Sequence, residues 1–363
     1  MKKNSVQIFV LGLVMSCITV SSFGQLGDIG ILITGTVPDD GKKLMKAYLK
    51  PLGNAMGANL SSGWYSTAKT HKLGGVDITF NLNLSIIPSA DKSFDLSSLA
   101  LSNGATGKAP TFSGSRNKGP LLTYYAPAPN NTYQLAHYNT PPGTGLSFLP
   151  SPMLQLGVGL IKDTELTGRF VPSVNIGKIG SFGLWGIGIK HGLKQWIPVI
   201  NKVPFLNLTL QAGYTSMSQS ANVKVTPDMI GSVDQTTAQA ANWSGQKMDL
   251  KVTNFTANIL VSVDIPVISV YGGVGISSSK TNLGMLGKYP VPTFGSTSQP
   301  SVVTDASMVT DPFHISIGSK DGSITKPRLN AGLLFKLAVL HIHFDYTYAN
   351  YSVATAGIGL SFR

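Results

Sequence analysis

The last residues of the chain alternate strictly between apolar and small or polar side chains. Over residues 352–363 the apolar positions are Ala354, Ala356, Ile358, Leu360 and Phe362, and the positions between them are Thr355, Gly357, Gly359 and Ser361. Alternation of period two places one set on each face of a β-strand. A soluble sheet can use the same pattern, but a strand that runs to the last residues is typical of barrels whose closing strand carries the signal for membrane assembly. The pattern therefore predicts a transmembrane β-barrel that the outer-membrane assembly machinery inserts.

The N-terminal residues have the features of a secretory signal peptide. Two lysines precede an apolar run over residues 6–20, and Ser22 and Gly24 are small residues at positions −3 and −1 of a cleavage site. The run is short and no cluster of stop-transfer charges follows it, as in a cleaved signal rather than a spanning helix. The sequence therefore predicts a signal peptide over residues 1–24.

An alternative is a lipoprotein signal in which residues 14–17 form the lipobox and Cys17 is lipidated. Met15 fits that pattern poorly, and the apolar run continues past the cysteine. Cys17 is also the one cysteine of the chain. Ordinary cleavage would therefore leave a mature chain without a disulfide, a thiol nucleophile or a cysteine metal ligand.

The composition has too few charges for an ordinary soluble protein. Asp, Glu, Lys and Arg make up 12% of the chain, and Gly alone contributes 40 residues, whereas about a quarter of a typical soluble chain is charged. No run after the signal peptide approaches the ~20 apolar residues of a transmembrane helix. The basic residues are scattered without a stripe or interleaved aromatics, so nucleic acid is not an expected partner. These features favour an outer-membrane β-barrel with the lipid bilayer as its partner.

Most of the chain after residue 57 has the pattern of strands. The clearest example, residues 76–86, alternates over eleven residues, which matches the roughly 9–11 residues of a tilted spanning strand. Twelve strands are predicted, at residues 58–67, 76–86, 92–100, 152–161, 164–172, 179–191, 203–216, 248–264, 266–280, 325–337, 339–348 and 352–363. Residues 121–125 and 132–138 are candidates for two more. The predicted fold is all-β: a transmembrane antiparallel up-and-down β-barrel of 12–14 strands over residues 58–363, with a short N-terminal helical plug.

Connection lengths predict an orientation, because bacterial barrels have short periplasmic turns and long extracellular loops. The three long connections, at about residues 101–151, 217–247 and 281–325, fall on one side of the predicted barrel. The loop positions Asn130, Gln235 and Gln299 are therefore expected outside the cell. The tight joints are expected in the periplasm, at Pro88, Asp264 and Ala338.

One helix is expected ahead of the barrel, at about residues 40–57. Asp39 or Asp40 can cap it, and Pro51 is expected to kink it or end it early. Its apolar stripe comprises Leu44, Tyr48, Leu49, Leu52 and Met56. A single short helix cannot bury such a stripe by itself. Residues 25–57 are therefore predicted to form a plug that docks against or inside the barrel.

Four predicted strands carry Gly-x-Gly near their middle, at residues 157/159, 186/188, 273/275 and 357/359. No third glycine opens a following helix, so these are not dinucleotide-binding motifs. The residue between the two glycines of each pair lies on the same strand face as the large apolar residues. The glycines are therefore predicted to face the lumen, where missing side chains leave room for curvature or contents.

A polar cluster is predicted on the lumen face of two neighbouring strands. It comprises Arg328, Asn330, Lys336, His341, His343 and Asp345. Two histidines at i and i+2 of a strand can share a metal, but no other ligand lies near them in the sequence, and no metal site is predicted. The chain also has no Gly-x-Ser-x-Gly elbow, so no enzyme, catalytic residue or cofactor site is predicted.

Three segments, residues 59–69, 184–191 and the final strand, resemble a family of Gram-negative outer-membrane barrels of unknown function that is distantly similar to the FadL/TodX hydrocarbon transporters. The resemblance covers most of the mature chain, but its motifs are residues that build a barrel. It implies a barrel closed by an N-terminal hatch, and an apolar ligand that enters from outside and leaves sideways. The chain departs from the transporters at residues 53–56, Gly-Asn-Ala-Met, where their hatch carries Asn-Pro-Ala. No ligand-contact residue is therefore carried over.

Two classes of function remain. The first is passive uptake of small hydrophobic molecules, which needs a hydrophobic ligand but no cofactor. The second is a non-transport surface protein whose long loops bind a partner or shield the cell. A hatch in the lumen with an apolar pocket under the loops favours the first class, and a lumen filled by side chains favours the second.

Overall fold

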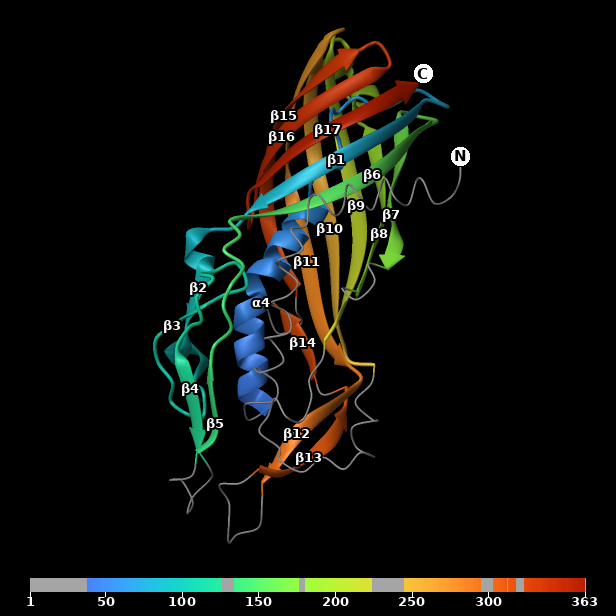
Figure 1. Ribbon diagram of the computed structural model, residues 1–363. Helices are drawn as coiled ribbons and strands as arrows, with labels where there is room; N and C mark the ends of the chain where they lie inside the picture. Colours follow the sequence, from blue (N-terminus) through green and yellow to red (C-terminus); the bar gives the residue numbers. More distant parts are fainter. Residues whose placement is uncertain are drawn as a thin grey trace.

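The computed structural model describes residues 38–125, 134–175, 180–223, 245–294, 303–311, 313–317 and 323–362. Within them, ten strands form a closed antiparallel barrel (Figure 1). The barrel strands are β1 (Val76–Ile86), β6 (Phe148–Leu160), β7 (Thr164–Asn175), β8 (Gly180–Gly192), β9 (Leu206–Asn222), β10 (Lys247–Asp264), β11 (Ile268–Leu286), β15 (Ser323–Leu337), β16 (Leu340–Tyr348) and β17 (Val353–Phe362). Each pairs with the next along the chain, and β17 pairs with β1 to close the barrel. The predicted fold class, an up-and-down antiparallel barrel with an N-terminal helix, is confirmed.

The barrel has ten strands rather than the predicted 12–14. Residues 58–67 form no strand: they complete a helix and continue as an irregular segment inside the barrel. Residues 92–100 contain only β2 (Ser93–Asp95) and a 3₁₀ turn (Leu96–Leu99). That turn forms because the Asp95 carboxylate accepts a hydrogen bond from the Ser97 amide, a local contact that competes with strand pairing.

The two candidate extra strands are real but lie outside the barrel. Strands β4 (Leu121–Tyr125) and β5 (Gln134–Asn139) pair only with each other. Two further small sheets pair β2 with β3 (Lys108–Pro110) and β12 (Lys288–Phe294) with β13 (Val303–Thr310). Strand β14 (Phe313–Ile317) adds to one end of β11. All these strands belong to long connections between barrel strands.

The barrel has two unlike ends. At the turn end, short connections join β6 to β7, β10 to β11 and β15 to β16. The longer β8–β9 connection is at the same end and holds a 3₁₀ turn (Lys194–Trp196) and α5 (Pro198–Asn201). At the loop end lie the long connections after β1, β9 and β11. Because residues 92–100 are not a barrel strand, Pro88 lies at the loop end, and the prediction that it shares one end of the barrel with Asp264 and Ala338 is wrong. Asn130, Gln235 and Gln299 lie outside the described residues.

The barrel wall is also higher on one side than on the other. Strands β9, β10 and β11 have 17, 18 and 19 residues, whereas β16 has nine. The long strands continue past the short ones at the loop end, where they stand opposite β2–β5 (Figure 1). The space between them holds helix α4 (Pro38–Ser61).

Helix α4 is longer than predicted and continues through Pro51 to Ser61. Asp39 and Asp40 lie in its first turn, where a negative charge favours the helix dipole. The Asp40 carboxylate also accepts hydrogen bonds from the Ser102 amide (2.8 Å) and hydroxyl (2.6 Å), which attach the helix to a loop. No helix in the described residues has the length and apolarity to cross a membrane.

Side chains along the barrel strands alternate between the outer face and the lumen, as expected from the sequence. Large apolar side chains point outward and are about half exposed, among them Ile187 (52%), Val274 (52%) and Ile358 (48%). The neighbouring Gly186, Gly188, Gly357 and Gly359 are buried and face inward. This arrangement gives the barrel an apolar outer surface and a polar, glycine-lined lumen.

Candidate functional site

The lumen holds an irregular segment, residues 62–75, which we call the lumen plug. Side chains of the wall bind its backbone directly. Asn81 donates to the Gly63 carbonyl (3.1 Å) and Gln155 to the Trp64 carbonyl (3.3 Å). Further along, Thr209 donates to the Ala68 carbonyl, and Lys190 donates to the Lys69 carbonyl at 3.1 Å. Side chains of four wall strands thus hold the backbone of the plug.

Two buried arginines hold the junction between α4 and the lumen plug. Arg169 on β7 donates to the carbonyls of Leu60 (3.1 Å) and Ser62 (2.7 Å). Arg328 on β15 donates to the Ser61 carbonyl at 2.6 Å. The last carbonyls of a helix have no partner within the helix and carry partial negative charge, so cations here are favourable. The two arginines cap the helix from opposite parts of the wall.

Trp64 lies next to this junction and packs against two glycines of the wall, Gly188 and Gly213. The Arg169 guanidinium carbon is 3.7 Å from the centroid of its ring. A Cβ atom on Gly188 would approach the ring to 2.6 Å, and one on Gly213 to 2.5 Å. These glycines leave the space that the indole occupies, as the inward-facing Gly-x-Gly pairs predicted. Next along the plug, burial raises the pKa of Tyr65 to about 12, so its phenol stays neutral.

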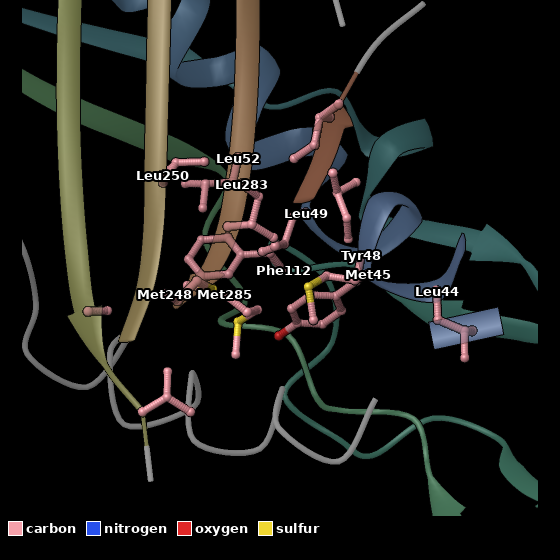
Figure 2. Close-up of a cluster of buried hydrophobic side chains, with 14 of the residues drawn as sticks. Leu44, Met45, Tyr48, Leu49, Leu52, Phe112, Met248, Leu250, Leu283 and Met285 are labelled. Atoms are coloured by element: carbon pink, nitrogen blue, oxygen red, sulfur yellow. The ribbon is translucent and has the colours of Figure 1, made fainter. Parts of the chain in front are cut away.

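Beyond the arginines, at the loop end, lies an apolar cluster that we call the loop-end core. Four of the predicted plug residues, Leu44, Tyr48, Leu49 and Leu52, are buried in it, and Met56 packs against it half-buried. Strands β10 and β11 contribute Met248, Leu250, Leu283 and Met285, and the loop after β3 contributes Phe112 (Figure 2). The apolar stripe of α4 therefore meets the tall part of the wall.

The six residues predicted as a lumen cluster lie on neighbouring strands but bind as separate groups. Asn330 donates to Asp345 (2.9 Å) and to Thr347 (2.9 Å). Lys336 forms an ion pair with Asp264 of β10 (3.1 Å), and His341 faces Asp77 of β1 (3.5 Å). Arg328 binds the helix end and also donates to Thr347 (3.3 Å), which it shares with Asn330. Among the described residues, His343 has no hydrogen-bond partner at either ring nitrogen.

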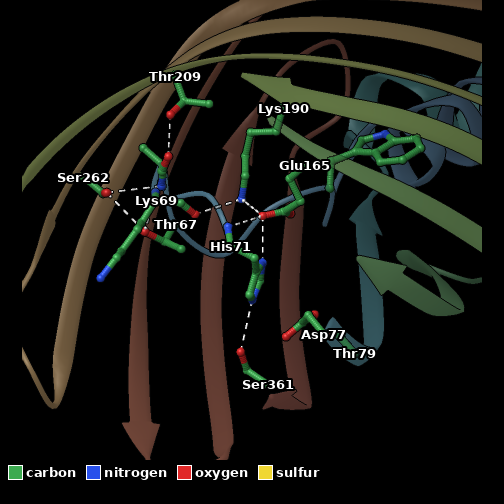
Figure 3. A network of polar contacts seen from close by, with 12 residues as sticks. Thr67, Lys69, His71, Asp77, Thr79, Glu165, Lys190, Thr209, Ser262 and Ser361 are labelled. Carbon is green, nitrogen blue, oxygen red and sulfur yellow. Dashed lines mark hydrogen bonds and ion pairs between the residues drawn. The ribbon is translucent and has the colours of Figure 1, made fainter. Parts of the chain in front are cut away.

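A second polar network attaches the far end of the lumen plug (Figure 3). Glu165 of β7 accepts from the amide of His71 (3.0 Å) and contacts its Nδ1 (2.8 Å). The Lys190 ammonium is 3.1 Å from the same carboxylate oxygen. His71 Nε2 reaches Ser361 of β17 at 3.0 Å. Across the part of the chain that the structure describes, no group of three or more His, Cys, Asp or Glu side chains could hold a metal ion.

Several residues of this site were not singled out from the sequence. Trp64 falls inside a predicted strand, and no motif marks Arg169 or Glu165 among the other strand residues. The alternation of strand faces does identify two of them. Leu166 and Phe170 point outward (42% and 60% exposed), so their neighbours Glu165 and Arg169 face the lumen. A charged side chain on the lumen face of a short strand needs a partner inside.

Three solved structures illustrate what the chain is similar to. The translocator domain of the autotransporter NalP from Neisseria meningitidis has 10% identity and a TM-score of 0.30, covering 81% of this chain and 89% of that one. The attachment invasion locus protein Ail of Yersinia pestis has 10% identity and a TM-score of 0.25, covering 80% and 98%. The toluene transporter TodX of Pseudomonas putida has 8% identity and a TM-score of 0.27, covering 85% and 97%. At sequence identities and TM-scores this low, the similarities give no information about function.

No curated protein matches the chain. A family model, described as a family of unknown function (DUF6588), matches residues 1–362, which is nearly the whole chain. The protein belongs to the DUF6588 family.

Proposed function

We propose that the protein is an outer-membrane barrel that takes up small hydrophobic molecules passively and performs no chemistry. The observation that carries the proposal is the loop-end core. It is a cluster of buried apolar side chains at the end of a barrel whose lumen is otherwise polar. An apolar guest gains roughly 25 cal/mol for each Å² that it buries there.

The loop-end core is rich in methionine, which suits a compartment that must open. Met45, Met153, Met217, Met248 and Met285 are all buried in it. Methionine is unbranched and polarizable, so it rearranges around a guest more readily than leucine or isoleucine. A hydrophobic solute would enter among these side chains from the loop end.

The outer surface supports a place in the bilayer. Half-exposed leucine, isoleucine and valine side chains cover it, and tyrosines lie near strand ends, as Tyr346 and Tyr348 do on β16. Such a band with flanking aromatics is the surface that a membrane barrel presents to lipid. With the signal peptide expected from the sequence, this favours the outer membrane, reached through its assembly machinery.

Methyl NMR tests the uptake proposal. The mature chain, labelled at its methionine methyl groups and held in lipid nanodiscs, would be titrated with toluene. We expect saturable shifts for Met45, Met248 and Met285, and no shift with glycerol. Leu283→Asn, which places a polar group in the loop-end core, should abolish the shifts. Leu121→Asn is the control, because Leu121 is 49% exposed in the β4–β5 hairpin.

The second candidate is a surface protein that transports nothing. What favours it is the density of contacts on the lumen plug, whose backbone is bound by side chains from β1, β6, β7, β8 and β9. If toluene shifts none of the three methionines and the barrel stays non-conducting in planar bilayers, the uptake proposal fails. The long loops would then be the functional surface.

A further inference from the structure

A cavity of ≈ 490 Å³ with polar and apolar lining lies between the lumen plug and the wall. Its rim includes Pro266, Ala338 and Val339, which belong to turns, so it opens at the turn end. Its inner part includes Trp64, Asn81 and His343. We call it the turn-end cavity. Arg169 and Trp64 separate it from the loop-end core, so it is a second compartment that the proposed uptake does not use.

The inner wall of this cavity carries buried polar atoms without partners. In the described residues, both ring nitrogens of His343, Oδ1 of Asn81 and Nε1 of Trp64 make no hydrogen bond. His343 is 2% exposed and Asn81 1% exposed. Buried polar groups normally find a partner, because leaving one unsatisfied costs free energy. These atoms belong to residues that line one cavity, so a polar solute bound there would gain hydrogen-bond partners once these side chains turn toward it.

The lining also favours a particular charge. It contains four lysines and two carboxylates, namely Lys69, Lys72, Lys190, Lys336, Asp77 and Glu165. Both carboxylates already face cationic or imidazole groups: Glu165 binds Lys190 and His71, and Asp77 faces His341. One further carboxylate, Asp264, stands behind Lys336. Lys190 and Lys336 are paired with Glu165 and Asp264, and with Asp77 included, four lysines face three carboxylates, so the lining carries a net positive charge.

We propose that the turn-end cavity binds a small solute that carries an oxyanion, either a carboxylate or a phosphate. Lysine ammonium groups and imidazole N–H groups are strong donors to such oxygens. Trp64, Tyr65, Leu334 and Val339 line the same cavity and can pack against an apolar body of the solute. A cation fits less well, because no metal-binding cluster exists among the described residues.

Histidine NMR on the full mature chain in a maltoside detergent tests this site. The chain has six histidines. His71, His341 and His343 line the cavity, whereas His137, His191 and His314 do not. The probes are benzoate, phenyl phosphate and the neutral benzyl alcohol. We expect each anion, or one of the two, to shift the three lining histidines saturably and to leave the other three unchanged. Which anion binds identifies the oxyanion, and benzyl alcohol should shift none.

A pair of lysine variants makes the test specific. Lys72→Gln removes an exposed rim lysine of the cavity, and Lys202→Gln removes an exposed lysine at the same end but outside it. Loss of a charge-assisted hydrogen bond should weaken anion binding about tenfold in the first variant and leave it unchanged in the second. The proposal is overturned if neither anion gives a saturable shift, if benzyl alcohol acts like the anions, or if both variants bind equally. Toluene binding at the methionines tests the uptake proposal separately, so either can fail without the other.

Discussion

The guanidinium of Arg169 stacks on Trp64, 3.7 Å from the ring centroid, while its nitrogen atoms bind the carbonyls of Leu60 and Ser62. One wall residue thus fixes both the end of α4 and the first turn of the lumen plug. The arrangement joins the helix, the plug and the barrel into one structure. The first two predictions follow from it.

Replacing Arg169 should loosen the plug. Arg169→Met keeps an unbranched apolar stem but leaves the Leu60 and Ser62 carbonyls short of donors, which costs about 1–3 kcal/mol for each group left unsatisfied. For the two carbonyls together we expect urea unfolding in detergent to show a free energy of unfolding lower by about 2–6 kcal/mol, and planar bilayers to show new channel openings. Arg116→Met is the control, since Arg116 lies in a loop and binds the Thr144 carbonyl (3.0 Å). Equal effects of the two variants would show that Arg169 has no special role in holding the plug.

A side chain added at Gly188, where the wall packs against Trp64, should displace the indole. Gly188→Val places a side chain where a Cβ alone would come within 2.6 Å of the indole, and overpacking of this kind costs about 1–3 kcal/mol. We expect a smaller fraction of protein to migrate as the compact unboiled form on a gel. Gly168→Val on β7 is the matched control, because a Cβ there meets nothing within 4 Å. If both variants assemble equally well, Trp64 does not pack against Gly188.

The unlike ends of the barrel predict an orientation in the membrane. Lys118 is exposed at the loop end and Lys202 is exposed at the turn end. In a mature chain without cysteine, Lys118→Cys should react with a membrane-impermeant maleimide on intact cells, and Lys202→Cys should react only after lysis. The reverse pattern would place the turn end outside the cell.

Sequence alone located the barrel strands well because alternation is a local signal. All ten barrel strands coincide with predicted strands, since lipid on one side and a polar lumen on the other impose a period of two. The same signal failed at residues 58–67. Residues 58–61 are the end of α4, and the irregular residues after them are held by wall strands that are distant in the sequence, contacts that no local pattern shows.

The contacts that organise the site could not be predicted from local patterns. Arg169 meets Ser62 across 107 positions of sequence, and Arg328 meets Ser61 across 267. Which inward-facing charge binds which part of the plug depends on how the closed barrel brings these strands together. Parity predicts only that Arg169, Glu165 and Lys190 point inward.

The barrel wall encloses α4 and the lumen plug, and α4 packs against β11. An engineered disulfide between α4 and β11 measures this contact. A Cβ built on Gly53 of α4 would lie 3.4 Å from the Cβ of Thr281 on β11, close to the roughly 3.5–4.5 Å of a disulfide. Gly53→Cys with Thr281→Cys should therefore crosslink under mild oxidation, with faster migration on a non-reducing gel that is reversed by a reductant. Gly168→Cys with Thr281→Cys is the control, since Gly168 has an outward-facing, open position, and it should not crosslink. Near-complete crosslinking of the first pair is expected in folded barrels, whereas two free thiols that both remain reactive to maleimide would show that α4 does not lie against β11.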